Sequence, residues 1–403
     1  MLPLGTELMK LYDIQPHEYS LLIFAFSLSG GTSAFAAAFY VDRFDRKTVL
    51  LTAFFFFAIG SLLCSYAYTY RLMLFARFFT GIFGGLLGGV STAFISDMIP
   101  YERRGKAMGI LNLGFGMASI IGIPFSIFIC EHLSVFWPFR IVGFLSLATL
   151  IPGILYLPNM RGHITEDNSN IKEIFIAIFS LVLYVPAHYF PKLRRPLRKN
   201  ISKIKEVLNV LRDRNLQNAL LFAFFLVLGH FMFISFINPY LVGNLGFKLE
   251  DTKWMYIVGG LSVTLTSPRI GKFIDTLGKL KSFRILIVLS FIPILAISHM
   301  HESSIMMALL ICAFMFIFNS GRMIAAMTLI TGAASEEQRG KFLVIRSALI
   351  ELSEGLSALI GGLILTKDSN GHLGNYEIIG YVAVLIGILC IYLAQRIQIK
   401  SEQ

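Results

Sequence analysis

Two glutamates three residues apart, Glu351 and Glu354, interrupt a long apolar stretch. Residues at this spacing lie on one face of a helix. Two neighbouring carboxylates in a low-dielectric setting do not both ionise at low cost, so reversible protonation is the chemistry that this pair favours. The alternative is a structural pair whose hydrogen bonds come from Ser353, Ser357 or Arg346.

Two arginines, Arg77 and Arg322, also stand within apolar stretches. If these stretches cross a membrane, each arginine costs about 2.5–3.5 kcal/mol on insertion scales, so it either has a function or extends toward the interface. Arg77 lies near one end of its stretch, which leaves both a gate or proton-relay role and simple snorkelling open. Arg322 either pairs with Glu351 or Glu354, or faces a cavity and holds an anionic or hydroxyl-rich substrate.

Four further residues are candidates on weaker grounds. His230 and Asn238 share one apolar stretch, where a single histidine is more often an ordinary hydrogen-bonded residue than a functional one. Gly122 and Pro124 favour a bend in their helix, because proline removes a backbone hydrogen bond. We keep the first two as candidates for proton coupling or a substrate cavity, and the other two as a helix-bending motif.

The composition places these residues in a membrane protein. Of 403 residues, 56% are hydrophobic, 37 are phenylalanine and only 15% are charged, whereas a soluble domain has roughly 25% charged residues. So much apolar surface needs the lipid bilayer as a second apolar solvent, which excludes a soluble enzyme, a disordered scaffold and a nucleic-acid-binding domain. The net charge of +11 then carries information on membrane orientation.

A membrane-crossing helix needs about 20 mainly apolar residues. By this measure the sequence predicts an all-α membrane protein with eleven transmembrane helices. Their approximate limits are 20–41, 48–69, 72–96, 106–130, 136–157, 215–237, 253–270, 284–299, 304–332, 342–365 and 377–395.

The basic residues predict the orientation of these helices. Of the 35 Lys and Arg residues, 27 fall in every second connection or at the C-terminus, which the positive-inside rule assigns to the cytoplasm. We therefore expect a multi-pass protein of the cytoplasmic (inner) membrane with a cytoplasmic C-terminus. The apolar segment 174–190 has basic flanks on both sides, so we expect an in-plane helix or hairpin there; a twelfth crossing is the alternative.

Two pairs of short motifs repeat at almost one offset. Asp42 and the basic residues after it match Asp275 and its turn, 233 residues later, and Gly105 matches Gly340, 235 residues later. Two independent matches predict two homologous halves.

This repeat predicts the organisation of the chain. We expect an N-terminal half at 1–157, a cytoplasmic linker at 158–214 and a C-terminal half at 215–403. The same offset puts the partner of helix 215–237 before Met1, so we expect the first half to lack its first helix.

The loop after the first predicted helix resembles the signature of the major facilitator superfamily, G-x-x-x-D-R-x-G-R-R. The matching residues are Asp42, Arg43, Arg46 and Lys47, while Ala38 and Asp45 replace the two glycines. The second-half copy keeps both glycines, as Gly271 and Gly278. The variant loop is most similar to the arabinose-efflux-permease-like branch of sugar and drug exporters. The resemblance implies a two-half helical bundle of which the eleven predicted helices are numbers two to twelve.

The resemblance also implies roles for particular residues. The signature loop, with Asp97, Arg103 and Arg104 as partners, would form a cytoplasmic gate that opens when the halves rock; the alternative is charge that only holds the loop inside. Gly122 and Pro124 resemble, imperfectly, the antiporter signature G-x-x-x-G-P-x-x-G, which favours export.

We therefore expect a secondary transporter that exports a small molecule, such as a sugar or drug, in exchange for protons. Proton-coupled uptake and a non-functional, N-terminally truncated fragment are the alternatives. An enzyme is not expected, because the sequence has no H-E-x-x-H, P-loop or G-x-S-x-G motif. The expected partners are substrate, protons and the lipid bilayer. We expect a monomer with no cofactor and no nucleic-acid partner. Because the four cysteines are far apart in the sequence, we expect no metal site.

Overall fold

The computed structural model describes residues 2–40, 45–98, 114, 117–158, 210–300, 304–368 and 371–399. Its N-terminal half comprises a 3-10 turn (Leu2–Leu4) and the helices α1 (Gly5–Leu11), α2 (Pro16–Tyr40), α3 (Arg46–Ser65), α4 (Tyr70–Met98), α6 (Ile123–His132) and α7 (Trp137–Tyr156), with a π-helical turn η3 (Ala118–Gly122) before α6. The C-terminal half comprises α10 (Arg214–Asn244), α11 (Leu249–Leu277), α12 (Lys279–Ser298), α13 (Ile305–Gly332), α14 (Glu336–Ile364) and α15 (Tyr376–Gln395). Two short strands, β1 (Thr366–Lys367) and β2 (Leu373–Gly374), pair antiparallel between α14 and α15.

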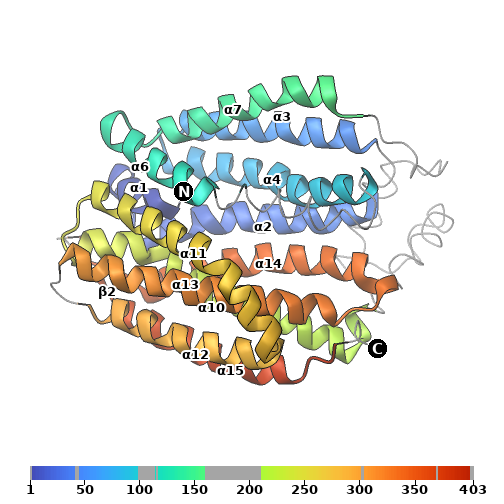
Figure 1. The fold of residues 1–403 in the computed structure, drawn as a ribbon. Coiled ribbons are helices and arrows are strands. Elements are labelled where there is room, and N and C mark those ends of the chain that lie inside the picture. Colours follow the sequence, from blue (N-terminus) through green and yellow to red (C-terminus); the bar gives the residue numbers. More distant parts are fainter. Residues whose placement is uncertain are drawn as a thin grey trace, which may run out of the picture.

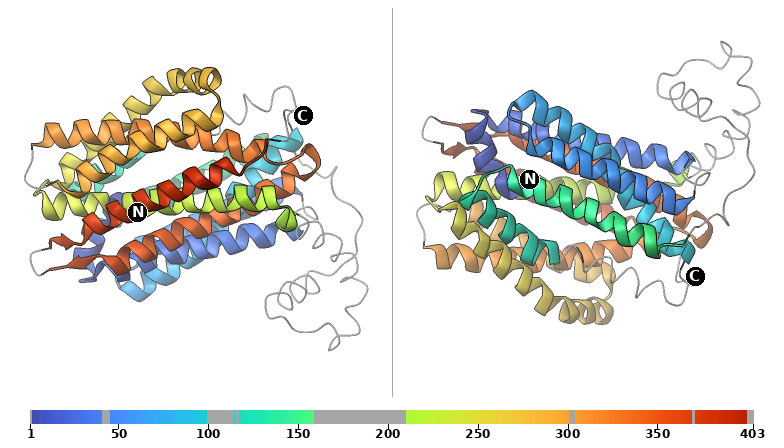
Figure 2. Two further views of the ribbon diagram at one scale, coloured as in Figure 1. Left: turned by 90° about the horizontal axis from the view of Figure 1, so that it is seen from below. Right: turned by 90° about the horizontal axis from the view of Figure 1, so that it is seen from above.

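Most of these helices are long enough and apolar enough to cross a bilayer. Eight described helices satisfy both conditions, and the views in Figures 1 and 2 show that the long helices run roughly along one axis. The polar and charged residues of α11 and α14 keep these two helices outside that set, although both have 29 residues. A search for apolar segments alone therefore misses α11 and α14, because their sequences contain many polar residues.

Side chains of the local sequence determine where several helices begin. The Asp45 carboxylate accepts a hydrogen bond from the Lys47 amide at the start of α3, and the Asp213 carboxylate accepts two from the first amides of α10. Such caps satisfy amide groups that have no partner within the helix. Gly278, with φ of +82°, turns the chain between α11 and α12, a conformation that costs glycine little.

Four predicted helix limits differ from the structure by five residues or more. α10 ends at Asn244 and not near residue 237, and α12 begins at Lys279 and not near residue 284. The other two limits fall at polar residues. The second-half copy of the signature was expected after a helix ending near residue 270, but α11 continues to Leu277, so Gly271 and Asp275 lie within its last turns. Similarly, α14 begins at Glu336 and not near residue 342. In both cases the polar residues continue the helix beyond its apolar part. The prediction failed there because hydropathy detects where the lipid ends and not where the backbone hydrogen bonds of the helix end.

The helices repeat at the offset that the motifs show. α2 and α11 begin at residues 16 and 249, and α3 and α12 begin at residues 46 and 279; both pairs are 233 residues apart. Within each half the packing is also equivalent, with α4 against α2 and α3 and with α13 against α11 and α12. Among the described residues α10, which packs on α14 and α15, has no equivalent in the first half. The expected absence of a first helix stays a prediction.

Two helix pairs make the largest contacts between the halves among the described residues. α2 packs along α14, and α6 with the turn η3 packs on α11. At the second contact, the Ile120 side chain lies so close to Gly260 that a methyl group there would force it to move. α14 lies between the halves, since it contacts α2 and α4 of one half and α10 and α15 of the other.

Candidate functional site

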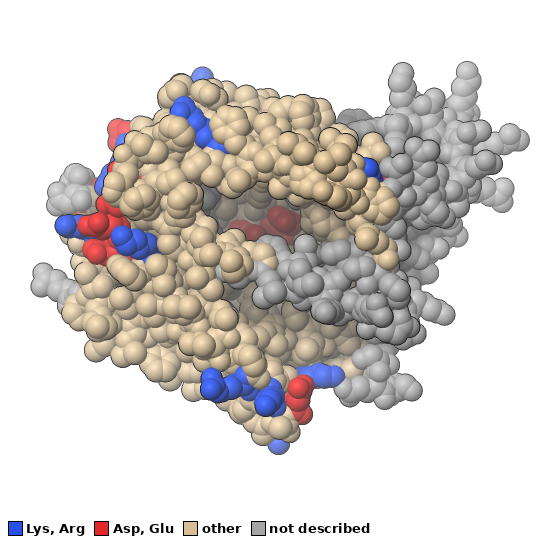
Figure 3. Space-filling model, turned by 45° about the horizontal axis from the view of Figure 1, so that its top comes forward, with Lys and Arg blue, Asp and Glu red and all other residues tan. Residues whose placement is uncertain are grey.

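The carboxylates of Glu351 and Glu354 lie on α14, where the two halves meet. The Oε2 atom of Glu351 is 3.4 Å from the position that a Cβ atom would take on Gly30 of α2. No described residue forms a hydrogen bond or an ion pair with either carboxylate, and both side chains are partly exposed. Figure 3 shows acidic side chains at the bottom of a hollow in the apolar surface.

The alternative of a satisfied structural pair is wrong. The Ser353 hydroxyl donates to the carbonyl of Phe224 at 2.7 Å, and the Ser357 hydroxyl donates to the backbone carbonyl of Glu354. Arg346 directs its guanidinium to the sulfur of Met327. The groups that the alternative assigned to the glutamates therefore have other hydrogen-bond partners.

Arg322 is buried in the C-terminal half, with no counter-ion among the described residues. One guanidinium nitrogen donates to the Ser290 hydroxyl at 3.1 Å, and another lies 3.4 Å from Nδ1 of His230. Among described residues no carboxylate lies within 4 Å, so the expected pairing with Glu351 or Glu354 is wrong. The side chain is 3% exposed and its Nε atom has no acceptor.

A cavity of about 150 Å³ lies between α10, α11 and α13; Arg322 does not line it, but it contacts His230, which does. Its polar lining consists of His230, Asn319 and Ser320. Asn319 is 4% exposed, and both its amide nitrogen and its amide oxygen lack hydrogen-bond partners in the protein. Buried polar groups in native proteins are normally paired, so an unpaired amide on a cavity wall marks a place where a ligand or water binds.

Arg77 on α4 faces the neighbouring helix of its own half. Its guanidinium lies 4.2 Å from the centre of the Phe26 ring on α2, and its Nε has no acceptor. The Thr80 hydroxyl donates to the carbonyl of Ala76 and so does not serve Arg77. Arg77 therefore packs against an aromatic face between helices and does not simply extend to the interface.

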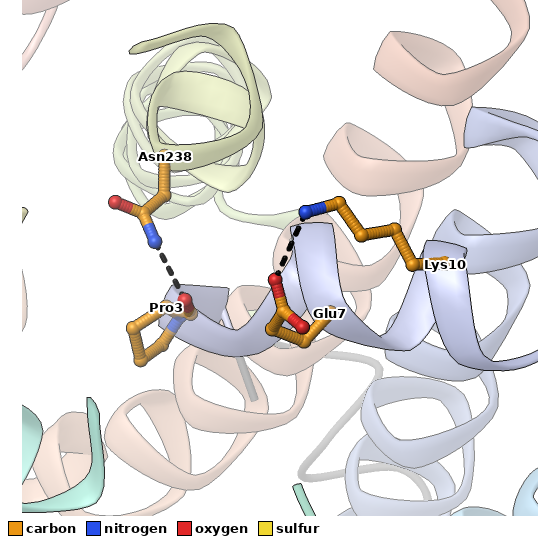
Figure 4. A network of polar contacts seen from close by, with 4 residues as sticks. All are labelled: Pro3, Glu7, Lys10 and Asn238. Carbon is orange, nitrogen blue, oxygen red and sulfur yellow. Dashed lines mark hydrogen bonds and ion pairs between the residues drawn. The ribbon is translucent and has the colours of Figure 1, made fainter. Parts of the chain in front are cut away.

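Asn238 has a structural environment at the other end of the bundle. Its amide nitrogen donates to the carbonyl of Pro3, which holds the N-terminal segment against α10 (Figure 4). In the same segment Lys10 pairs with Glu7 at 3.3 Å, and the Tyr12 hydroxyl donates to the carbonyl of Ala67. The N-terminal segment thus contacts both halves. Asn238 belongs to this contact and does not line the cavity between α10, α11 and α13.

Part of the signature loop lies within the described residues. Arg46 is buried at the start of α3, and the Lys47 ammonium donates to the carbonyl of Ile154 on α7 at 2.8 Å. Asp275 is exposed near the end of α11. The remaining gate candidates, Asp42, Arg43, Arg103 and Arg104, and the segment 174–190 lie outside the described residues, and Asp97 is described only as a residue of the last turn of α4.

The helix-bending motif falls at a contact between the halves. Gly122 ends the π-helical turn, and Pro124 is buried at the start of α6. A π-turn places one extra residue in the helix and changes its direction. Gly122 and Pro124 therefore lie where η3 and α6 meet α11.

Sequence reasoning missed Ser290 and Phe26, the neighbours of Arg322 and Arg77. Serine and phenylalanine are ordinary residues in apolar helices, so neither carries a signal of its own. Their importance follows from the arginines they contact, and those contacts join different helices.

Comparisons with known proteins identify the class to which this arrangement belongs. The family model of the Major Facilitator Superfamily matches residues 1–318 and 219–398. An uncharacterized MFS-type transporter, YwfA of Bacillus subtilis (strain 168), is 25% identical over 96% of this chain and 83% of its own length. A probable sugar efflux transporter of Helicobacter pylori (strain P12) is 21% identical over 99% of this chain and 90% of its own length.

Solved structures show the same fold. A bacterial homolog of the human lysosomal transporter Spinster, in an inward-facing and occupied conformation, superposes with a TM-score of 0.67 at 14% identity, covering 98% of this chain and 91% of that one. A point mutant of the nucleoside transporter NupG superposes with a TM-score of 0.64 at 14% identity, covering 98% of this chain and 94% of that one.

The chain belongs to the Major Facilitator Superfamily. It is a multi-pass membrane transporter with the all-α fold of that family and not an enzyme, which confirms the sequence-based expectation for fold and class.

Proposed function

We propose that the protein exports a small molecule from the cytoplasm in exchange for protons, across the cytoplasmic membrane and with its C-terminus inside. The observation that carries this proposal is the pair Glu351 and Glu354, which has no partner among the described residues and lies where α14 meets α2. Carboxylates at this place can take up and release protons as the halves move, because their surroundings change with each movement.

The direction of transport rests on less specific support. Gly122 and Pro124 resemble an antiporter motif, and their π-helical turn contacts α11 of the other half. A relative that covers nearly the whole chain is named a probable sugar efflux transporter. Export by proton antiport is the function that these observations favour together.

Proton flux in proteoliposomes tests the coupling. Vesicles with an acidic lumen and an enclosed pH-sensitive dye are diluted into alkaline buffer that contains glucose, arabinose or a sugar acid. For an antiporter, an external substrate speeds the loss of luminal protons. We expect a Glu351→Gln/Glu354→Gln double variant to lose this acceleration by about tenfold or more, the loss typical of removing a group that transfers a proton.

Two controls sharpen this test. A Ser347→Ala variant changes a side chain that bonds the Leu343 carbonyl on the same helix, and its flux should match that of the wild type. A symporter would instead acidify a neutral lumen when substrate is added without an imposed gradient. Undiminished coupling in the double glutamine variant would remove both carboxylates from the mechanism.

A further inference from the structure

A buried positive charge lies behind one wall of the cavity between α10, α11 and α13: Arg322 contacts His230, which lines the cavity, and has no carboxylate partner among the described residues. The guanidinium is 3% exposed, and its hydrogen-bond partners, Ser290 and His230, are neutral or titratable groups without negative charge. Among the described residues, no aspartate or glutamate lies within 4 Å of it. An unpaired buried charge is costly, and an anion bound nearby would offset that cost.

The hydrogen bonds already formed leave mainly donors for a ligand. Because arginine has no acceptor, Nδ1 of His230 must accept in this contact, which places the hydrogen of a neutral imidazole on Nε2. The Ser290 hydroxyl donates to the carbonyl of Ile287 at 2.6 Å and accepts from Arg322. The donors that remain are Nε2 of His230, the amide nitrogen of Asn319 and the hydroxyl of Ser320 on the cavity wall.

The shape of the cavity limits what can bind. Its volume of about 150 Å³ is enclosed on the apolar side by Ile234, Phe316 and Met323. A cavity of this size is comparable with one that holds a single small ring. Asn319 also offers an unpaired amide oxygen, which can accept from a hydroxyl group next to the anionic group.

We propose that this cavity is the subsite for a carboxylate group of the substrate, and that the transported compound is a small organic acid, with or without hydroxyl groups. The proposal rests on the transport function proposed above and gives its substrate class. A neutral sugar would leave the Arg322 charge uncompensated. Its hydroxyl groups would also accept weaker hydrogen bonds than a carboxylate does at the same place, since hydrogen bonds to a charged acceptor are about twice as strong as those to a neutral one.

Ligand binding to the purified full-length protein in detergent tests this proposal without any ion gradient. Glucuronate and glucose share a ring and hydroxyl groups and differ in one carboxylate, and benzoate provides a carboxylate without hydroxyls. At equal concentration and ionic strength, we expect glucuronate to raise the midpoint of thermal unfolding and glucose to leave it unchanged. A shift with benzoate as well would show that the carboxylate is sufficient.

Variants link the binding to the cavity. Replacing Arg322 with methionine should weaken glucuronate binding about tenfold or more, because it removes the positive charge that lies directly behind the His230 wall. Arg322→Lys should retain part of the affinity, and Asn319→Leu should weaken binding while leaving the charge in place. Arg140→Met removes an arginine that stacks on Tyr66 and Trp137 away from the cavity, and its affinity should match the wild type.

Three outcomes would overturn the proposal. These are equal shifts with glucose and glucuronate, no shift with either carboxylate at tens of millimolar in a folded protein, and an affinity that Arg322→Met leaves unchanged. Because the assay needs neither protons nor transport, binding of glucuronate with no proton-linked flux would instead contradict the proposed coupling alone.

Discussion

At the scale of single residues, each half holds an arginine inside its helix bundle with no carboxylate partner among the described residues. Arg77 on α4 lies against the Phe26 ring, and Arg322 on α13 lies against Ser290 and His230. α4 and α13 occupy equivalent places in the two halves, but the arginines stand about seven and seventeen residues into their helices. The halves therefore share a backbone plan and differ in where they hold positive charge.

Arg77→Met separates a structural from a functional role for this charge. The substitution loses a cation–π contact of about 0.5–2 kcal/mol but also removes an unpaired buried charge. We expect the midpoint of thermal unfolding to stay within about 4 °C of the wild type, while the proton-linked flux falls. A large loss of stability with normal flux per folded molecule would show that Arg77 serves packing alone.

At the scale of elements, glycines set the distance between α2 and α4. The backbone of Gly85 on α4 lies directly against Gly30 on α2, and a methyl group on Gly85 would collide with the Gly30 carbonyl. Gly81 lies equally close to the Phe26 carbonyl and the Ser29 hydroxyl. Small residues allow helix backbones in membranes to approach, and α2 then has its other face free for α14.

Two alanine substitutions on one helix test this contact. Gly85→Ala should lower the midpoint of thermal unfolding, with a cost on the order of 1–3 kcal/mol for forcing the helices apart. Gly88→Ala, three residues later, should be neutral or slightly stabilising, because no atom of the described residues lies within 4 Å of its added carbon and alanine favours a helix by roughly 0.5–1 kcal/mol. Equal effects of the two substitutions would contradict the close approach.

At the scale of the whole molecule, side chains tie the helix ends into two opposite layers. At one end, the Asn215 amide at the start of α10 donates to carbonyls of Ala333 and Gln398, after α13 and α15. At the other end, Asn244 bonds Leu373 of the short hairpin, and the N-terminal segment contacts α10. With the C-terminus on the cytoplasmic side, as proposed above, this first layer, which contains Gln398, faces the cytoplasm.

Cysteine labelling of the two ends of α11 tests this arrangement. Lys248 and Lys281 are both exposed, the first just before α11 and the second just after it. In right-side-out vesicles, an impermeant maleimide should modify Lys248→Cys and not Lys281→Cys until the membrane is permeabilised. The native cysteines are all buried, which keeps the background low. Modification of both positions from one side would overturn the topology.

The sequence alone determined the helices, their repeat and the class of protein. Each crossing needs an apolar segment that satisfies its own backbone, so Pro16–Tyr40, Arg46–Ser65 and Lys279–Ser298 are visible as local patterns. The 233-residue offset is visible for the same reason, because it depends only on positions along the chain. Helix ends were predicted less accurately where polar residues continue the helix, as at Asp275 and at the start of α14.

Only the tertiary structure decided the partners of the buried polar residues. One of the two interpretations of Arg322 paired it with Glu351 or Glu354 on the next helix, yet its contacts are His230 and Ser290, 92 and 32 residues away in the chain. Asn238 was expected near a cavity, yet it holds Pro3. Both outcomes depend on how each helix is rotated about its axis and against which neighbour it packs, and many side chains acting together set that rotation, with no local pattern to reveal it.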